Sequence, residues 1–204
     1  AAFSTGRRFP SLIFVGLGLA RDCADLPHSQ SFALREPLIL EYGGLRVKRL
    51  GLRIFNFDSG LAPAGKTSAV VMIETADDEF WTSLARRDPA AYRAAKAEVA
   101  DKVVAALDAQ IPGFASWVET IDVATPRTFL RYTNNWHGSY EGWLPTVDSL
   151  GKKFPRTLPG LRGFHMVGQW VNPGGGLPPC GMDGRSLAKK LCAAEGRPFR
   201  PDAA

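Results

Sequence analysis

The residues best suited to chemistry lie near the C-terminal end, in a glycine-rich segment. The run from Gly168 to Pro178 reads GQWVNPGGGLP. Three successive glycines expose backbone N–H groups and let the main chain approach a flat ligand closely. A helix starting just after them would add partial positive charge, which suits an anionic group. The same residues also fit a plainer interpretation, a flexible loop followed by a terminal amphipathic helix.

Cysteine and histidine are too few and too widely spaced for the common metal and nucleophile sites. The sequence has three of each, with no C-x-x-C pair, no H-E-x-x-H motif and no G-x-S-x-G nucleophile elbow. An odd number of cysteines argues against a disulfide scaffold and favours a reducing compartment. We therefore predict no metal site, and we expect a cytoplasmic protein, with peripheral membrane contact as the alternative.

The composition is that of an ordinary globular chain of 204 residues, with 45% hydrophobic and 22% charged residues. Apolar stretches such as Ser11–Ala20 are shorter than the roughly 20 residues that cross a bilayer. The 25 basic residues exceed the 20 acidic ones and give a net charge of +5, but they are scattered in isolated pairs. Nucleic acid is not a predicted partner, because no basic patch or recognition motif accompanies this charge.

Upstream of the glycine-rich segment, the pattern predicts a sheet with helices. Short apolar runs rich in β-branched and aromatic residues predict strands at 11–19, 38–42, 52–57, 67–74 and 117–124. We expect 52–57 and 67–74 to be neighbours, because turn residues separate them. A short helix carries Phe80 and Trp81, and Asp88-Pro89 begins the longest helix. Gly16-x-Gly18 is not a phosphate loop, because Arg21 replaces the third glycine.

The C-terminal part reads as a strand, a glycine-rich loop and a helix. The strand is Phe164–Gly168, and the helix has an apolar face made of Leu187, Ala188, Leu191 and Cys192. Before it, the tract Thr133–Trp143 is rich in asparagine, glycine and aromatic residues. Its flat side chains either form a well-packed loop or border a substrate pocket made of Trp136, Tyr140 and Trp143.

Several of these motifs together resemble the phytoene desaturase-like FAD oxidoreductases, relatives of carotenoid desaturases and isomerases and, more distantly, of amine oxidases. Gly168–Pro178 looks like their C-terminal flavin-binding signature, and Leu61–Thr67 resembles their LAPEGKT hairpin. The tract from Thr125 to Trp143 is similar to their "TP…GS…GW" passage, and Pro27–Ser29 matches a further feature. The matches follow the same order along most of the chain.

The resemblance implies a fold of the α+β or α/β class in two parts. Residues 1–137 would be a mixed β-sheet substrate domain with helices. Residues 138–204 would be the C-terminal strand–loop–helix of a two-part, Rossmann-like FAD-binding domain, with the strand Phe164–Gly168 joining the FAD-domain sheet. The G-x-G-x-x-G half is absent from this sequence. The implied cofactor-binding residues are Gly168, Gln169, Pro173, Gly174, Gly175, Gly176, Leu177 and Pro178.

The function implied by the resemblance is a dehydrogenase or desaturase type of oxidoreductase that acts on an apolar small molecule with FAD. No residue is assigned a catalytic role. An N-terminal FAD-domain chain, or self-association, would complete the protein, and this chain alone is expected to be inactive and to bind FAD weakly or not at all. The alternative is a non-catalytic binding or assembly module derived from the same fold.

Overall fold

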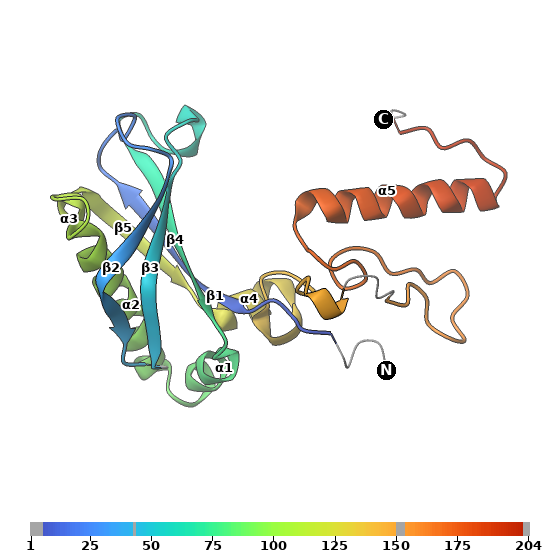
Figure 1. Ribbon diagram of the computed structural model, residues 1–204, viewed down its shortest axis with the longest axis horizontal. Helices are drawn as coiled ribbons and strands as arrows, with labels where there is room; N and C mark the ends of the chain where they lie inside the picture. The colour runs from blue at the N-terminus through green and yellow to red at the C-terminus, as the bar shows by residue number, and fades with distance from the viewer. Residues whose placement is uncertain (1–5, 43, 150–153, 202–204) are drawn as a thin grey trace. The chain divides into compact units, whose positions relative to one another are not determined.

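The computed structural model describes residues 6–42, 44–149 and 154–201, and the chain divides into two compact units (Figure 1). The first unit is Pro10–Gly138. The second combines the N-terminal segment up to Phe9 with the chain from Ser139 onward. No described helix is both long and apolar enough to cross a membrane.

The first unit contains an antiparallel sheet. Its strands in spatial order are β2 (Ser29–Leu40), β3 (Leu45–Ile54), β4 (Thr67–Thr75), β1 (Ser11–Leu19) and β5 (Val118–Ala124). β1 and β4 agree closely with the predicted strands, and β2 and β3 begin earlier than predicted. The expected pairing of 52–57 with 67–74 is confirmed, since Leu52 lies opposite Val71.

The prediction of a mixed sheet is wrong, because every pairing among the described strands is antiparallel. A short turn joins β2 to β3, and such a turn can only reverse the chain, whereas a parallel pair needs a long crossover. The helical connection from β4 to β5 is long enough for a crossover. It places β5 beside β1, however, and β1 runs in the opposite direction.

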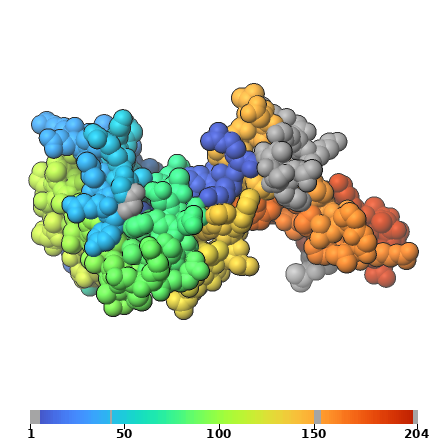
Figure 2. Space-filling model, turned by 90° about the horizontal axis from the view of Figure 1, so that it is seen from below, coloured from blue at the N-terminus to red at the C-terminus, as the bar shows by residue number. Residues whose placement is uncertain are grey.

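Helices cover one face of this sheet. They are α1 (Asp78–Arg87), α2 (Pro89–Asp108) and α3 (Phe114–Trp117), whose apolar residues share the core of the sheet, while α4 (Pro126–Thr133) follows β5 and packs with α1 and the turn Trp136–Gly138. The start of α2 is as predicted, because the Asp88 carboxylate accepts hydrogen bonds from the N–H groups of Ala90 and Ala91. Val99, Val103 and Leu107 of α2 are buried in the same core as the inward residues of the strands. Figure 2 shows the surface that α1 and α2, in green, give this unit.

The second unit has one long helix, α5 (Leu177–Ala194), and much irregular backbone. The predicted strand Phe164–Gly168 is wrong, because these residues lie in turns and irregular structure. A strand needs a partner for its backbone groups, and no described strand pairs with this segment. Gly163 and Gly168 at its ends also have positive φ, which interrupts an extended chain.

Candidate functional site

The glycine-rich loop before α5 has a backbone that only glycine adopts easily. Gly174, Gly175 and Gly176 have φ angles of 116°, 55° and 83°. The space where a Cβ of Gly174 would point is open, with no atom within 4 Å. Helix α5 then begins with Leu177, Pro178 and Pro179, and because proline has no N–H, Leu177 is the one backbone donor among these three residues. The loop is therefore open at Gly174 and is followed by a helix N-terminus, which together suit a flat ligand with negative charge, while Gly175 is buried against Glu141.

The segment around Trp143 packs along this loop. Trp143 N–H donates to the Gln169 carbonyl at 3.2 Å, and Gly174 N–H donates to the Trp143 carbonyl at 3.1 Å. Gly142 must be glycine, because a Cβ there would collide with the Gln169 carbonyl group. Two motifs that the resemblance connected, the "GW" passage and the C-terminal signature, are thus adjacent in the folded second unit.

Trp143 is the centre of a small apolar core in this unit. Its ring is buried and stacks on Phe154, with centroids 5.1 Å apart and planes 9° from parallel. Trp170 meets it edge-on at 5.2 Å, and the indole N–H donates to the Trp170 carbonyl at 2.8 Å. The side chain of Trp143 therefore packs inside the second unit, and its backbone holds the glycine-rich loop.

Asp183 ties α5 to the first residue of the signature. Its Oδ2 accepts a 2.8 Å hydrogen bond from the Gly168 N–H, and its Oδ1 lies 2.6 Å from an Arg156 guanidinium nitrogen. The Asp183 side chain is only 6% exposed, and it is the one residue of α5 that is buried. Both of its oxygens have partners, so its charge is compensated as burial requires.

Glu141 is a residue of this site that sequence reasoning missed. A Cβ built at Gly175 would lie 2.7 Å from the Glu141 side chain, so the missing side chain at Gly175 makes room for this carboxyl group. Burial raises the pKa of Glu141 above its ordinary value. In sequence, Glu141 is one acidic residue in an aromatic tract, and only its folded position against the loop distinguishes it.

The predicted pocket residues Trp136, Tyr140 and Trp143 are divided between the two units. Trp136 belongs to the first unit, in a short 3₁₀ turn (Trp136–Gly138), and is 53% exposed. Tyr140 belongs to the second unit, where its ring meets Phe9 edge-on. None of the three lines a pocket described within either unit.

Beside Trp136, His137 forms a pair with a buried acid. His137 Nδ1 lies 2.7 Å from Asp78 Oδ2 at the start of α1. The Asp78 side chain is 7% exposed and the His137 side chain 46%. His137 has a φ of 56°, which is uncommon for a residue other than glycine. The pair holds this strained turn against α1.

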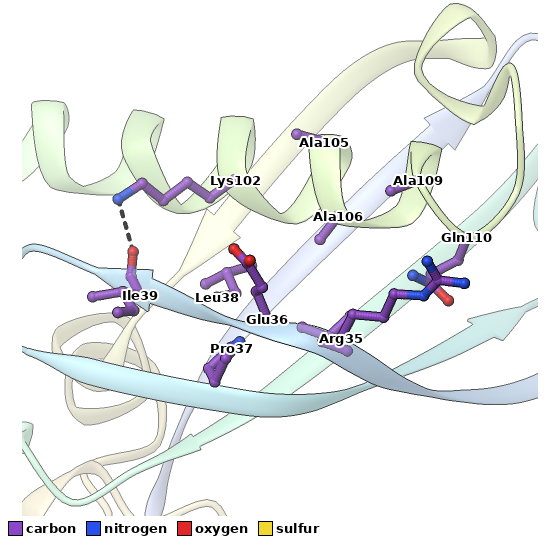
Figure 3. A pocket seen from close by; sticks show the side chains of 11 residues that line it. Arg35, Glu36, Pro37, Leu38, Ile39, Lys102, Ala105, Ala106, Ala109 and Gln110 are labelled. Atoms are coloured by element: carbon purple, nitrogen blue, oxygen red, sulfur yellow. Dashed lines mark hydrogen bonds between the residues drawn. The ribbon is translucent and has the colours of Figure 1, made fainter.

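The first unit has a pocket of about 820 Å³ between β2 and α2 (Figure 3). Ala105 and Ala106 of α2 and Ala109 just after it form one wall, and their small side chains leave the space open. At one end Lys102 Nζ donates to the Ile39 carbonyl at 2.7 Å, which joins the helix to the strand. Apolar walls with a few polar groups at the rim are typical of small-molecule pockets.

A smaller pocket in the second unit, of about 420 Å³, lies beside α5. Arg156, His165 and Asp183 form its polar side, and Leu187 and Leu191 form its apolar side. The predicted apolar face of α5 is thus partly accessible, with Leu191 39% exposed.

Comparison with known proteins gives a partial match to one kind of protein. The chloroplastic prolycopene isomerase of Daucus carota is 30% identical over 140 residues, which are 67% of this chain and 22% of that protein. The chloroplastic prolycopene isomerase of Arabidopsis thaliana is 31% identical over 140 residues, with the same shares. The match thus covers about a fifth of the length of these curated relatives. No family model matches the chain.

Proposed function

We propose that this chain, a distant homologue of the prolycopene isomerases over 140 of its residues, is the flavin-facing C-terminal part of an FAD-dependent oxidoreductase of the carotenoid desaturase and isomerase group. In this proposal, Pro10–Gly138 supplies the substrate domain and the chain from Ser139 supplies the flavin segment. The observation that carries it is the glycine-rich loop, which is open at Gly174 and is held in place by Trp143 and Asp183.

The residues of the loop fit a flavin. The groups that would hold it are the backbone of Gly174–Gly176, the start of α5 at Leu177 and Pro178, and Gly168, Gln169 and Pro173 before them. Because the backbone is open at Gly174, a flat ring can approach without displacing a side chain. The partial positive charge of the helix N-terminus favours negative charge on the ligand.

FAD supplies hydride chemistry when it is bound, and the protein contributes binding, orientation and electrostatics. The substrate that we propose is an apolar small molecule. Two observations support this class: the curated relatives are named for prolycopene, and the first unit has an alanine-lined pocket.

A titration of the isotopically labelled chain with FAD, followed by NMR, tests this proposal. The affinity is expected to be weak, and NMR detects binding at millimolar ligand. We expect the amide signals of Gly168 and Gly174–Gly176 to shift in a saturable way, while signals of β2 and β3 stay in place. Shifts confined to the first unit, or none at millimolar FAD, would contradict it.

A second candidate function is an assembly module without catalysis. It is favoured by large apolar side chains that α5 leaves exposed, Leu177 at 89% and Met182 at 69%. Sedimentation of the chain over a range of concentrations tests this candidate. Self-association that is lost in Met182→Glu, while the FAD-induced shifts are missing, would favour assembly over flavin binding.

A further inference from the structure

Among the described acidic side chains of the second unit, Glu141 is the one that is partly buried without an ion pair, since Asp148 also lacks a pair but is exposed. In the described part of the chain Glu141 makes no ion pair, and no donor reaches its carboxylate. By contrast, Asp183 is paired with Arg156, and Glu195 lies near Arg197. An acid that is half-buried without a partner is retained at a cost, because burial disfavours its charged form.

Its position is set by the loop itself. The Glu141 side chain occupies the space that a Cβ of Gly175 would take. Its Oε1 lies 3.7 Å from the position that a Cβ of Gly176 would take. Gly142, the next residue, is fixed against the Gln169 carbonyl. The carboxyl group is therefore held beside the glycines, within reach of whatever the loop binds.

The nearby charges do not neutralise it. Arg7 and Arg8 lie on the N-terminal segment that pairs with residues 142–144, and Asp183 is the buried acid of α5. Neither arginine forms an ion pair with Glu141, and both Asp183 oxygens are engaged elsewhere. Burial is the sole cause of the raised pKa of Glu141, which places its titration nearer to neutral pH than that of an ordinary glutamate.

A flavin changes its own charge in the reaction cycle. The oxidised ring is neutral, and uptake of two electrons and one proton gives an anionic reduced ring. Two negative charges held close together oppose each other, so a neighbouring carboxylate then binds a proton more tightly. The helix N-terminus at Leu177 would favour the anionic ring, whereas an ionised Glu141 beside the ring would disfavour the anionic form.

We propose that Glu141 is the residue that balances charge at the flavin segment: its carboxylate takes a proton from solvent when the bound ring is reduced and releases that proton when the ring is oxidised. This inference rests on the proposed function. Glu141 is a positioning residue in this scheme, since it exchanges a proton with water and no bond to the substrate is formed or broken. Reduction of a bound ring by a two-electron donor such as dithionite, which is itself oxidised, would then take up two electrons and two protons in total, one proton on the ring and one on Glu141.

The test uses riboflavin, which lacks phosphate, so that only the charge of the ring changes. Its oxidised and dithionite-reduced forms are titrated anaerobically into the full chain between pH 5 and 8, with binding followed by NMR. For the wild type, we expect the affinity for reduced relative to oxidised riboflavin to fall about tenfold more across this range than for Glu141→Gln. Glu195→Gln, an exposed acid of the same unit, should behave as the wild type does.

A second measurement does not depend on a variant. The side-chain carboxyl carbon of Glu141, followed by ¹³C NMR, should titrate at higher pH when reduced riboflavin is present than when the oxidised form is present. Binding with the same pH dependence in the wild type and Glu141→Gln, or an unchanged carboxyl titration, overturns the role of Glu141 and leaves the proposed function standing. If neither form of riboflavin binds at any pH, and FAD does not bind either, then the role of Glu141 and the proposed function are both overturned.

Discussion

The carboxylate of Asp183 accepts a 2.8 Å hydrogen bond from the backbone N–H of Gly168, fifteen residues earlier in the chain. This contact closes the loop that contains the glycine-rich signature, and Arg156 compensates the remaining charge at 2.6 Å. One buried side chain of α5 thereby fixes where the signature begins.

Replacing Asp183 should loosen this loop. Asp183→Ala leaves the Gly168 N–H and the Arg156 guanidinium without their acceptor, so we expect the second unit to lose about 2 kcal/mol of stability. Asp183→Asn keeps an acceptor and should lose less. Urea unfolding measures the loss of stability, and hydrogen exchange at the Gly168 amide measures the loosening of the loop. Equal protection of this amide in the wild type, Asp183→Ala and Asp183→Asn would contradict the prediction.

Gly142 should tolerate no side chain. Gly142→Ala places a Cβ against the Gln169 carbonyl, so the contact between Trp143 and the loop must open. We expect a loss of about 1–3 kcal/mol, the usual cost of overpacking. Gly181→Ala is the matched control, because its Cβ would meet nothing within 4 Å and alanine favours the interior of α5. The midpoint of the unfolding curve should fall for Gly142→Ala and rise for Gly181→Ala, relative to the wild type.

The stability of the second unit should depend on Glu141 and pH. Because burial raises the folded-state pKa of Glu141, the folded chain holds its proton more tightly than the unfolded chain. Stability from this group is complete below the ordinary glutamate pKa and is lost as pH rises through the folded value. Glu141→Gln should therefore gain stability relative to the wild type as pH rises from 4 to 7. A constant difference between the two proteins over that range would disagree with this cause.

Cys23 should be the least reactive cysteine. It is buried, while Cys180 and Cys192 are partly exposed, and all three are free. Burial raises the pKa of the Cys23 thiol, so the nucleophilic thiolate is scarce. A thiol reagent followed by mass spectrometry should label Cys180 and Cys192 first, and Cys23 only after urea is added. Rapid labelling of Cys23 in the folded chain would contradict the described burial.

The sequence predicted the first unit well because its elements are locally determined. The apolar run of β1 and the Asp88-Pro89 start of α2 each depend on a few neighbouring residues, and both occur where expected. The all-antiparallel pairing was missed because strand direction depends on where β5 lies after a long helical connection. Residue pattern carries no signal for that choice.

The second unit was harder to predict for the opposite reason. Phe164–Gly168 has the composition of a strand, but a strand exists only where another strand supplies backbone partners. The importance of Glu141 could not be read from sequence either. It follows from two contacts, that of Glu141 with Gly175 and that of Gly142 with Gln169, which are made only by folding.

The most direct measurement is the flavin absorbance of this chain when it is co-expressed and co-purified with the remaining part of the carrot prolycopene isomerase. Gly175→Val serves as the variant, because its side chain would collide with the Glu141 side chain and must displace the loop backbone, and Gly181→Ala serves as the control. We predict that flavin co-purifies with the wild type and the control and is lost in Gly175→Val. Flavin that is absent from the wild-type complex, or equally retained in Gly175→Val, would contradict the assignment of Gly168–Pro178 as the flavin segment.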